Sequence, residues 1–288
     1  MNIRLGVVGF GTMGSEIALL GACAGMEVAA HDSFPGALEH GMKRLAKLAK
    51  MLARDEKFFG AAQVATDEGR EGVLARIHPA TRMDGLAECD YVIEATPEML
   101  ELKQAVFSEL SKHCRPDALL ATNTSSIGIS EIAASATHPE RVVGMHFFNP
   151  PTLMQLIEVV AGLNTGEAAV EAALGLAKAL GKTGIRVKET PGFIVNRVLT
   201  AMMNEAITLL EEGVASMEDI DDAMRLGAGF PLGPFKLADL VGLDVYTRVC
   251  DTIYQELGRE KFRPPFTLRQ YVRAGRLGRK TKQGFYKY

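Results

Sequence analysis

Residues Ile3 to Gly14 read IRLGVVGFGTMG, and this stretch decides the fold of the chain. The apolar run from Ile3 to Phe10 predicts a short strand, and the glycines that follow have the spacing G-x-G-x-x-G. Such glycines permit a tight turn, a close approach of a pyrophosphate and close helix packing. The next helix then faces the phosphates with its N-terminal N–H groups. The stretch therefore predicts a dinucleotide site that contains Gly9, Gly11, Thr12, Met13 and Gly14.

The next predicted strand, EVAAHD, ends at Asp32. In dinucleotide-binding folds a carboxylate at that place binds the ribose diol and repels a 2′-phosphate. No arginine follows at once, so Asp32 favours NAD over NADP. An ordinary strand–turn–helix with a surface aspartate is the alternative interpretation, and the spacing and position weigh against it.

Strands and helices alternate through the N-terminal part of the chain. Further strands are predicted at residues 91–95, 118–122 and 141–147, with helices between them. This alternation predicts a mostly parallel sheet whose two faces are both covered by helices.

The pattern changes at KETPGFIVNRV, after which the sequence indicates only helices as far as about Ala274. We therefore predict a domain boundary near Glu189. An α/β nucleotide-binding domain would cover residues 1–189, and an all-helical domain would cover residues 190–288.

A long helix is predicted to begin the second domain. Thr190 can cap it and Pro191 can take its first position, so we place the helix over Gly192 to Glu212. Apolar residues surround most of its circumference, and such a helix must be buried on more than one side. Because a small helical domain can hardly do this alone, we expect a second copy of the chain to pack against it.

Composition excludes several classes of protein. With 288 residues, 47% hydrophobic and 23% charged, the chain is typical of a soluble globular protein. A net charge of −3 gives no reason to expect nucleic acid or a membrane surface as partner. The four cysteines are scattered, which favours neither a disulfide framework nor a metal site. The chain has no apolar run long enough to span a membrane and no signal-peptide pattern, so we expect a cytoplasmic location.

One histidine and one glutamate interrupt the apolar stretch GMHFFNPPTLMQLIEVV, residues Gly144 to Val160. His146 and Glu158 are symmetric about Thr152, beside a Pro-Pro turn. If the two segments pair as antiparallel strands, this symmetry brings the two side chains together. A buried imidazole beside a carboxylate is a candidate general base with the group that orients it. The alternative is a hydrogen-bonded core histidine and a charge at a sheet edge.

Seven segments occur in an order that resembles the 3-hydroxyacyl-CoA dehydrogenase family: GFGTMG, EATPE, NTSSIGISEIA, GMHFFNPP, ETPGFIVNR, GPFKLADLVGLD and GRKTKQGFYKY. The resemblance covers almost the whole chain, and the length fits the short bacterial-type members of the family. It implies a Rossmann-like NAD domain over residues 1–189 and a helical domain for substrate binding and dimerisation over residues 190–288. It also implies oxidation of an (S)-3-hydroxyacyl-CoA, with 3-hydroxybutyryl-CoA as the expected short-chain substrate.

The resemblance also assigns roles to individual residues. His146 matches the catalytic base and Glu158 its acidic partner, while Ser125 and Asn196 match polar groups around the substrate oxygens. The positions that match the NAD site are Glu98, Lys103, Asn149 and Lys280. From the residues alone, the serine also fits a strand-end turn or a helix cap, and the asparagine a polar spot on a buried helix. One departure is KTKQGF, where the family more often has glycine after the threonine, and this leaves the shape of the C-terminal turn open.

Four cations recur at steps of 4, 3 and 4 along EHGMKRLAKLAKMLARDEK, a predicted helix: Lys43, Lys47, Lys50 and Arg54. This spacing predicts that they share one helical face. Such a stripe could bind the nucleotide phosphates of CoA, or it could be an ordinary solvated face.

Two other functions fit the same plan of domains. The first is a 2-hydroxyacid or sugar-acid dehydrogenase that uses a lysine base on the long helix. Here Asn196 and Arg197 stand in that helix without a lysine nearby. The second is an NAD-binding structural or regulatory protein without activity, because a fold alone does not prove catalysis. The preferred acyl chain length and the pathway, butanoate synthesis or fatty-acid degradation, stay open.

Overall fold

Eight strands form one sheet in the first of two units of the chain, whose computed structural model describes residues 3–288. Within the sheet the strand order is β3-β2-β1-β4-β5-β6-β7-β8, and β6–β7 is the one antiparallel pair. The strands are β1 (Arg4–Val8), β2 (Glu27–His31), β3 (Ile77–Ala80), β4 (Tyr91–Glu94), β5 (Leu119–Thr122), β6 (Val142–Phe147), β7 (Leu156–Ala161) and β8 (Thr183–Lys188). The predicted doubly wound, mostly parallel α/β fold is confirmed.

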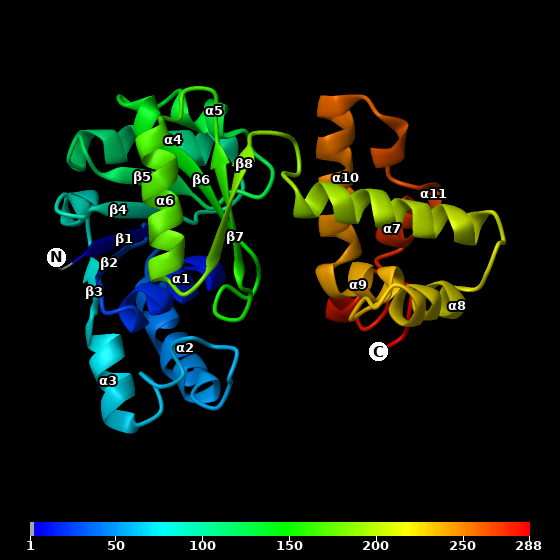
Figure 1. Cartoon of the computed structure of the whole chain (residues 1–288), viewed down its shortest axis with the longest axis horizontal. Coiled ribbons are helices and arrows are strands. Elements are labelled where there is room, and N and C mark those ends of the chain that lie inside the picture. The colour runs from blue at the N-terminus through cyan, green and yellow to red at the C-terminus, as the bar shows by residue number, and fades with distance from the viewer. Residues whose placement is uncertain (1–2) are drawn as a thin grey trace. The chain divides into compact units, whose positions relative to one another are not determined.

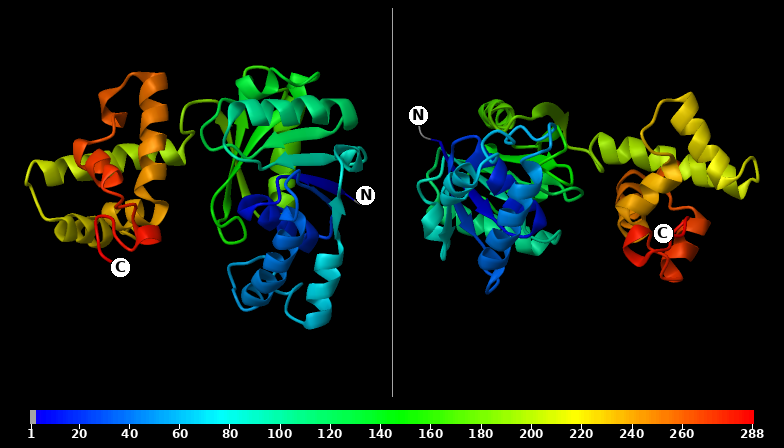
Figure 2. Two further views of the ribbon diagram at one scale, coloured as in Figure 1. Left: turned by 180° about the vertical axis from the view of Figure 1, so that it is seen from behind. Right: turned by 90° about the horizontal axis from the view of Figure 1, so that it is seen from below.

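Helices cover both faces of this sheet. Helix α6 crosses one face, and α4 lies on the opposite face (Figure 1, Figure 2). The helices of this unit are α1 (Thr12–Cys23), α2 (Ala37–Leu52), α3 (Asp67–Ala75), α4 (Leu100–His113), α5 (Ile129–Ala133) and α6 (Glu167–Ala179), with 3₁₀ turns η1 (Met83–Leu86) and η2 (Pro139–Arg141). Because strands β1 to β6 run parallel, their carboxyl ends meet at one edge of the sheet, where the loops carry the candidate site.

The second unit begins at Thr190 and is helical, with a short C-terminal tail. Its helices are α7 (Val195–Glu211), α8 (Met217–Asp222), the π-helical segment η3 (Ala223–Gly227), α9 (Pro234–Val241), α10 (Leu243–Leu257), η4 (Glu260–Phe262), α11 (Phe266–Arg273) and η5 (Arg279–Thr281). Its core joins α7, α9, α10 and α11 around buried side chains such as Ile207, Phe235 and Tyr246. Isolated bridges, Gly278 with Gln283 and Gln283 with Lys287, shape the tail.

The long helix begins later than predicted. Helix α7 starts at Val195, because Gly192 and Phe193 take left-handed backbone angles, φ 73° and 46°. Those angles do not belong to a right-handed helix. Thr190 and Pro191 therefore precede a turn, and the prediction that they start the helix is wrong.

Two elements of the first unit had no counterpart in the sequence prediction. Strand β3 is a short edge strand that contains Pro79, and proline in a strand sequence argues against a central position. Helix α3 is capped by Thr66, whose side chain accepts a hydrogen bond from the N–H of Gly69. That cap is the local sequence signal that predicts its start.

Candidate active site

The glycine-rich turn between β1 and α1 has the geometry that a dinucleotide requires. Gly9 has φ 88°, and a Cβ on Gly14 would overlap the carbonyl oxygen of Gly9. Around Gly11, by contrast, a Cβ would meet no atom within 4 Å. The turn thus needs glycine for its own packing at two positions and leaves open space at the third.

Asp32 lies directly after β2 and is fixed by the same turn. Its carboxylate accepts hydrogen bonds from the N–H groups of Phe10 at 2.7 Å and Phe34 at 2.8 Å. A cavity of about 640 Å³ opens beside it. Among the residues that line this cavity are Gly9, Gly11, Thr12, Met13, Asp32, Phe34 and Leu102. Open backbone N–H groups, a fixed carboxylate and an apolar wall fit the phosphates, the ribose and the adenine of NAD.

His146 and Glu158 face each other across the antiparallel strands β6 and β7. Their Cα atoms are direct partners in the register, and Nδ1 of His146 donates a hydrogen bond to Oε2 of Glu158 at 2.7 Å. The two residues are 6% and 1% exposed. Phe148 packs against the imidazole with a centroid distance of 4.5 Å. The antiparallel pairing that the sequence predicted is confirmed. It places a carboxylate where it fixes the tautomer and the orientation of the ring.

Ser125 lies in the loop after β5, where Glu98 holds it. Oε1 of Glu98 accepts hydrogen bonds from the N–H of Ser125 at 2.8 Å and from its hydroxyl at 3.2 Å. The hydroxyl groups of Thr124 and Ser126 donate to the same oxygen. Burial opposes ionisation of Glu98, but these hydrogen bonds and the charge of Lys103 outweigh it and lower its pKa. The loop is therefore organised around a carboxylate that is ionised at neutral pH.

Lys103 and Glu94 form a fully buried ion pair behind Glu98. The ammonium group of Lys103 lies 2.9 Å from Oε1 of Glu94 and 3.5 Å from Oε2 of Glu98. Glu94 also accepts hydrogen bonds from Thr96 and Thr122. Because one cation joins both carboxylates, the end of β4 is tied to the Ser125 loop.

Of the remaining predicted residues, Asn149 belongs to the first unit, whereas Asn196 and Lys280 belong to the second. Asn149 is exposed, two residues after β6, and precedes a cis proline. Asn196 stands in the first turn of α7, in the second unit. Lys280 is in the C-terminal tail, where it donates a hydrogen bond to Asp244 at 2.5 Å.

The cationic stripe is shorter than predicted. Lys43, Lys47 and Lys50 are exposed on α2, whereas Arg54 lies beyond the helix, which ends at Leu52. The prediction of four cations on one helical face is therefore wrong for Arg54. Lys43 also forms an ion pair with Glu39 at 2.5 Å.

The sequence prediction missed two supporting residues. Glu94 lies in the predicted strand YVIEA and is the last residue of β4, but only its buried contact with Lys103 shows that it belongs to the site. Asn123 lies in the quoted segment NTSS and accepts a hydrogen bond from the N–H of Phe147 at 2.9 Å. A polar residue at the end of a buried parallel strand is the signal that both share.

The glycine-rich turn and the cavity beside Asp32 are the features of a dehydrogenase that uses a dinucleotide, and the same unit holds the buried His146–Glu158 pair. Two family models match the chain. The model described as "3-hydroxyacyl-CoA dehydrogenase, NAD binding domain" matches residues 4–190, and the model described as "3-hydroxyacyl-CoA dehydrogenase, C-terminal domain" matches residues 192–288. The chain belongs to the 3-hydroxyacyl-CoA dehydrogenase family, and its cofactor is NAD.

Full-length relatives agree with this family. A 3-hydroxybutyryl-CoA dehydrogenase of Clostridioides difficile is 41% identical over 286 residues, with 99% of each chain covered. A probable 3-hydroxybutyryl-CoA dehydrogenase of Bacillus subtilis is 44% identical, with 98% of this chain and 96% of the relative covered. The crystal structure of (S)-3-hydroxybutyryl-CoA dehydrogenase PaaH1 from Ralstonia eutropha superimposes with a TM-score of 0.93 at 40% identity, covering 100% and 99% of the two chains. Across residues 3–288, no helix combines the length and the apolar character that crossing a membrane requires.

Proposed function

We propose that this enzyme catalyses the reversible oxidation of (S)-3-hydroxybutyryl-CoA to acetoacetyl-CoA. The observation that carries the proposal is the buried hydrogen bond of 2.7 Å between Nδ1 of His146 and Glu158. The full-length similarity to 3-hydroxybutyryl-CoA dehydrogenases supports the choice of substrate.

His146 would act as the general base. Because Nδ1 donates to Glu158, the proton of the substrate hydroxyl would be received at Nε2. Glu158 then stabilises the imidazolium as it forms, and in the reverse direction His146 returns the proton to the developing alkoxide. The hydride on the carbon that bears this hydroxyl would be transferred to NAD, which supplies the oxidant when bound.

Ser125 and Asn196 would donate hydrogen bonds to the substrate oxygens. Glu98 holds Ser125 in position, because it accepts a hydrogen bond from the backbone N–H of that residue. The hydroxyl donates to Glu98 in the structure and would have to turn its O–H toward the substrate. Glu98, Lys103, Asn149 and Lys280 would belong to the NAD site. A role of this kind explains why so many hydrogen bonds converge on one loop, since an active-site donor must be held in place before the substrate arrives.

The nucleotide end of CoA would lie against the basic surface of α2. Lys50 and Arg54 line a cavity of about 550 Å³ together with Arg70, between α2 and α3. Three cations around one hollow suit the phosphates of CoA as point charges. A Lys43/Lys47/Lys50 triple alanine variant should lose affinity for the CoA thioester and keep its affinity for the pantetheine thioester. Equal losses for both substrates would exclude this placement.

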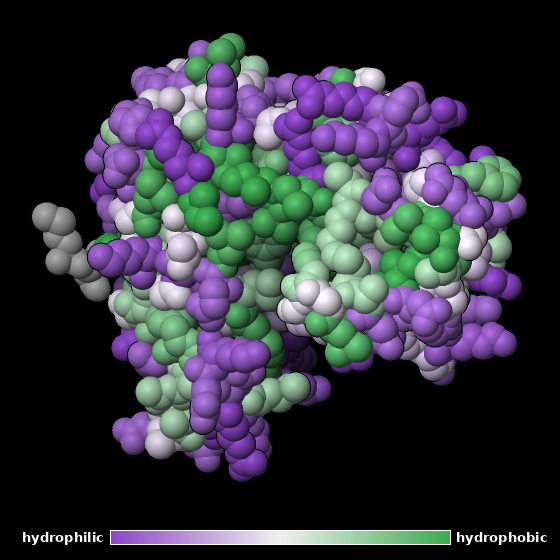
Figure 3. Space-filling model, turned by 45° about the vertical axis from the view of Figure 1, so that its right-hand side comes forward, coloured by the Kyte–Doolittle hydropathy of each residue, from purple (hydrophilic) through white to green (hydrophobic). Residues whose placement is uncertain are grey.

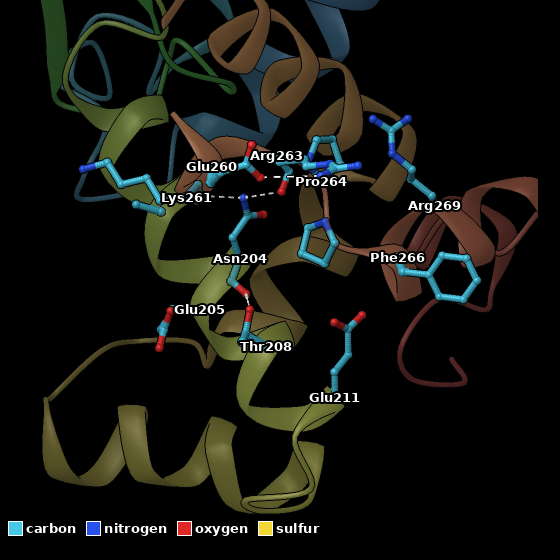
Figure 4. A pocket seen from close by; sticks show the side chains of 12 residues that line it. Asn204, Glu205, Thr208, Glu211, Glu260, Lys261, Arg263, Pro264, Phe266 and Arg269 are labelled. Carbon is cyan, nitrogen blue, oxygen red and sulfur yellow. Dashed lines mark hydrogen bonds and ion pairs between the residues drawn. The ribbon is translucent and has the colours of Figure 1, made fainter. Parts of the chain in front are cut away.

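A second copy of the chain would pack against the helical unit. Val198 of α7 is 62% exposed, and Leu226 and Phe266 of the same unit are also exposed hydrophobic residues. Figure 3 shows that hydrophobic (green) areas lie among hydrophilic (purple) ones on one face of the molecule. Along the same helix a cavity of about 350 Å³ opens, with Glu205 and Glu211 on α7 and Lys261, Arg263 and Arg269 facing it (Figure 4). A surface that carries both signs of charge can complement its own copy in a two-fold interface. Val198→Asp should convert a dimer into a monomer in sedimentation measurements, whereas wild-type protein that sediments as a monomer would exclude the dimer.

We also propose that the enzyme works in the cytoplasm. All four cysteines are buried free thiols, as a reducing compartment favours. Cell fractionation with an antibody against the chain tests this location, and recovery outside the cytoplasmic fraction would refute it.

One assay tests the activity. Acetoacetyl-CoA and NADH are mixed with the purified enzyme, and the absorbance of the reduced cofactor is followed. We expect rapid oxidation of NADH, with rates along a series of longer thioesters giving the chain-length preference. Activity on free hydroxy acids alone would favour a 2-hydroxyacid or sugar-acid dehydrogenase, and binding of NAD without turnover would favour a structural or regulatory protein.

A further inference from the structure

Three buried polar side chains meet outside the catalytic pair, and none has a role in the mechanism above. Glu16 lies on α1, Thr152 in the loop between β6 and β7, and Lys182 directly before β8. They are 5%, 1% and 6% exposed. The three elements are far apart in the sequence, so this contact exists only in the folded chain.

Glu16 is the centre of the group. Its Oε2 accepts a hydrogen bond from the hydroxyl of Thr152 at 2.8 Å and a longer one from the N–H of the same residue at 3.4 Å. Lys182 donates to the carbonyl oxygen of Thr152 at 3.3 Å. Burial lowers the pKa of Lys182 to about 8, although the charge of Glu16 acts in the opposite direction. Thr152 is thus held at its hydroxyl, its N–H and its carbonyl.

The place of Thr152 in the chain explains why these contacts can affect the catalytic pair. It is the midpoint of the hairpin whose strands carry His146 and Glu158, six residues away on each side. Glu16, on the other side of the hydrogen bond, belongs to the helix that begins at the glycine-rich turn. Two hydrogen bonds from Thr152 to Glu16, the shorter one from the hydroxyl, therefore join the loop of the catalytic hairpin to the helix that would receive the cofactor phosphates.

Arg44 of α2 ties the same helix from outside. Its guanidinium group lies 4.0 Å from Oε1 of Glu16 and donates hydrogen bonds to the carbonyl oxygens of Gly11 and Thr12 at 3.0 and 2.9 Å. A buried carboxylate close to a phosphate site would repel the phosphates. The cations Arg44 and Lys182 offset that charge from two sides.

We propose that the Glu16–Thr152 hydrogen bond sets the position of the His146–Glu158 hairpin relative to the nucleotide-binding helix, so that Glu16 and Thr152 are positioning residues for hydride transfer. Buried charges add little stability compared with apolar residues of the same size. Directional hydrogen bonds to a buried carboxylate do, however, specify one position of the loop. Hydride transfer depends steeply on that position, since a displacement of about 1 Å can lower a rate about 10²-fold. The inference rests on the proposed function.

The test compares Thr152→Val with Thr152→Ser. The valine has the shape of threonine without the hydroxyl donor, whereas the serine keeps the donor. We expect the valine variant to lose about tenfold in kcat, while its Kd for NAD stays close to that of the wild type. The primary isotope effect with substrate deuterated at the reacting carbon should rise in the valine variant. The serine variant should restore both values, which a role in stability alone would not do.

A double-mutant cycle provides the second measurement. Glu16→Ala removes the acceptor of both hydrogen bonds from Thr152, so the addition of Thr152→Val to Glu16→Ala should lower kcat no further. Multiplying losses in kcat would overturn the proposal, as would equal losses in the valine and serine variants. The proposed function is decided separately, by whether the wild-type enzyme turns over CoA thioesters, because the ratio between the two threonine variants is measured on whichever substrate is active.

Discussion

Both units of the chain bury carboxylates, but the partners of these carboxylates differ. In the first unit Glu158 accepts a hydrogen bond from the imidazole of His146 at 2.7 Å. In the second unit Asp239 accepts hydrogen bonds from the N–H groups of Phe285 and Tyr286, both at 2.9 Å, and is 1% exposed. Imidazole exchanges its proton near neutral pH, and a backbone amide does not. Burial alone therefore does not distinguish a catalytic carboxylate from a structural one, and the chemical nature of the hydrogen-bond partner has to be considered as well.

The second carboxylate of the helical unit repeats the structural pattern. Asp221 is buried and accepts hydrogen bonds from the N–H groups of Phe235 and Lys236, at the start of α9, and from the hydroxyl of Tyr286. Burial raises the pKa of Tyr286, and the hydrogen bond to Asp221 raises it further. Together the two aspartates fix the C-terminal tail to α9, whereas the carboxylates of the first unit organise loops around an open site.

The largest expected effect concerns the imidazole of His146. His146→Ala should lower kcat by ~10²–10⁴-fold, the usual contribution of a general base, because the proton of the hydroxyl loses its acceptor. Steady-state turnover of 3-hydroxybutyryl-CoA gives the loss, and fluorescence titration gives the affinity for NAD, which should not change.

The same unit offers a matched control. His138 and Glu140 also form a histidine–glutamate pair, at 3.1 Å, but both side chains are exposed. His138→Ala should keep the wild-type rate. A near wild-type rate for His146→Ala would show that His146 is not the general base.

The second prediction concerns Asp239, the buried carboxylate of the helical unit. Asp239→Ala should lower the free energy of unfolding by about 3 kcal/mol, because two buried N–H groups lose a charged acceptor. Denaturant unfolding measures this loss, and faster hydrogen exchange at Phe285 and Tyr286 would locate it in the tail. Asp251 forms a half-buried ion pair with Arg269 at 2.7 Å, so Asp251→Ala should cost less than about 1 kcal/mol. Equal losses in the two variants would show that burial of Asp239 adds nothing.

Short-range patterns made the two central features predictable from the sequence. The glycine spacing defines the turn, and the symmetry of His146 and Glu158 about Thr152 defines the register, because each depends on residues close together in the chain. The change from alternating strands to helices indicated a second region for the same reason.

Contacts between distant segments were not predictable in this way. Glu98 holds Ser125 from 27 residues away, and Glu16 meets Thr152 across 136 residues. Nothing in the local sequence specifies either pair. The start of α7 was missed for another reason. Thr190 and Pro191 are residue types that commonly start a helix, but the left-handed backbone angles of Gly192 and Phe193 do not belong to a right-handed helix.

The smallest expected effect tests the tail that Asp239 anchors. Lys282 has φ 57° and ψ 10°, a left-handed conformation that glycine adopts without strain. The turn therefore keeps a shape suited to glycine although lysine stands there. Lys282→Gly should raise the free energy of unfolding by about 0.5–1 kcal/mol, since the strain of the left-handed lysine exceeds the entropy that glycine adds to the unfolded chain.

Lys287 is the matched control, because it lies in the same exposed tail without a positive φ. Lys287→Gly should leave the stability unchanged or lower it slightly, because glycine there relieves no strain and only loosens the unfolded chain. If both glycine variants destabilise equally, the left-handed turn does not limit the stability of the tail. If only Lys282→Gly stabilises and the rate of turnover stays constant, this turn of the tail contributes to structure alone, in contrast to the loops around His146 and Ser125.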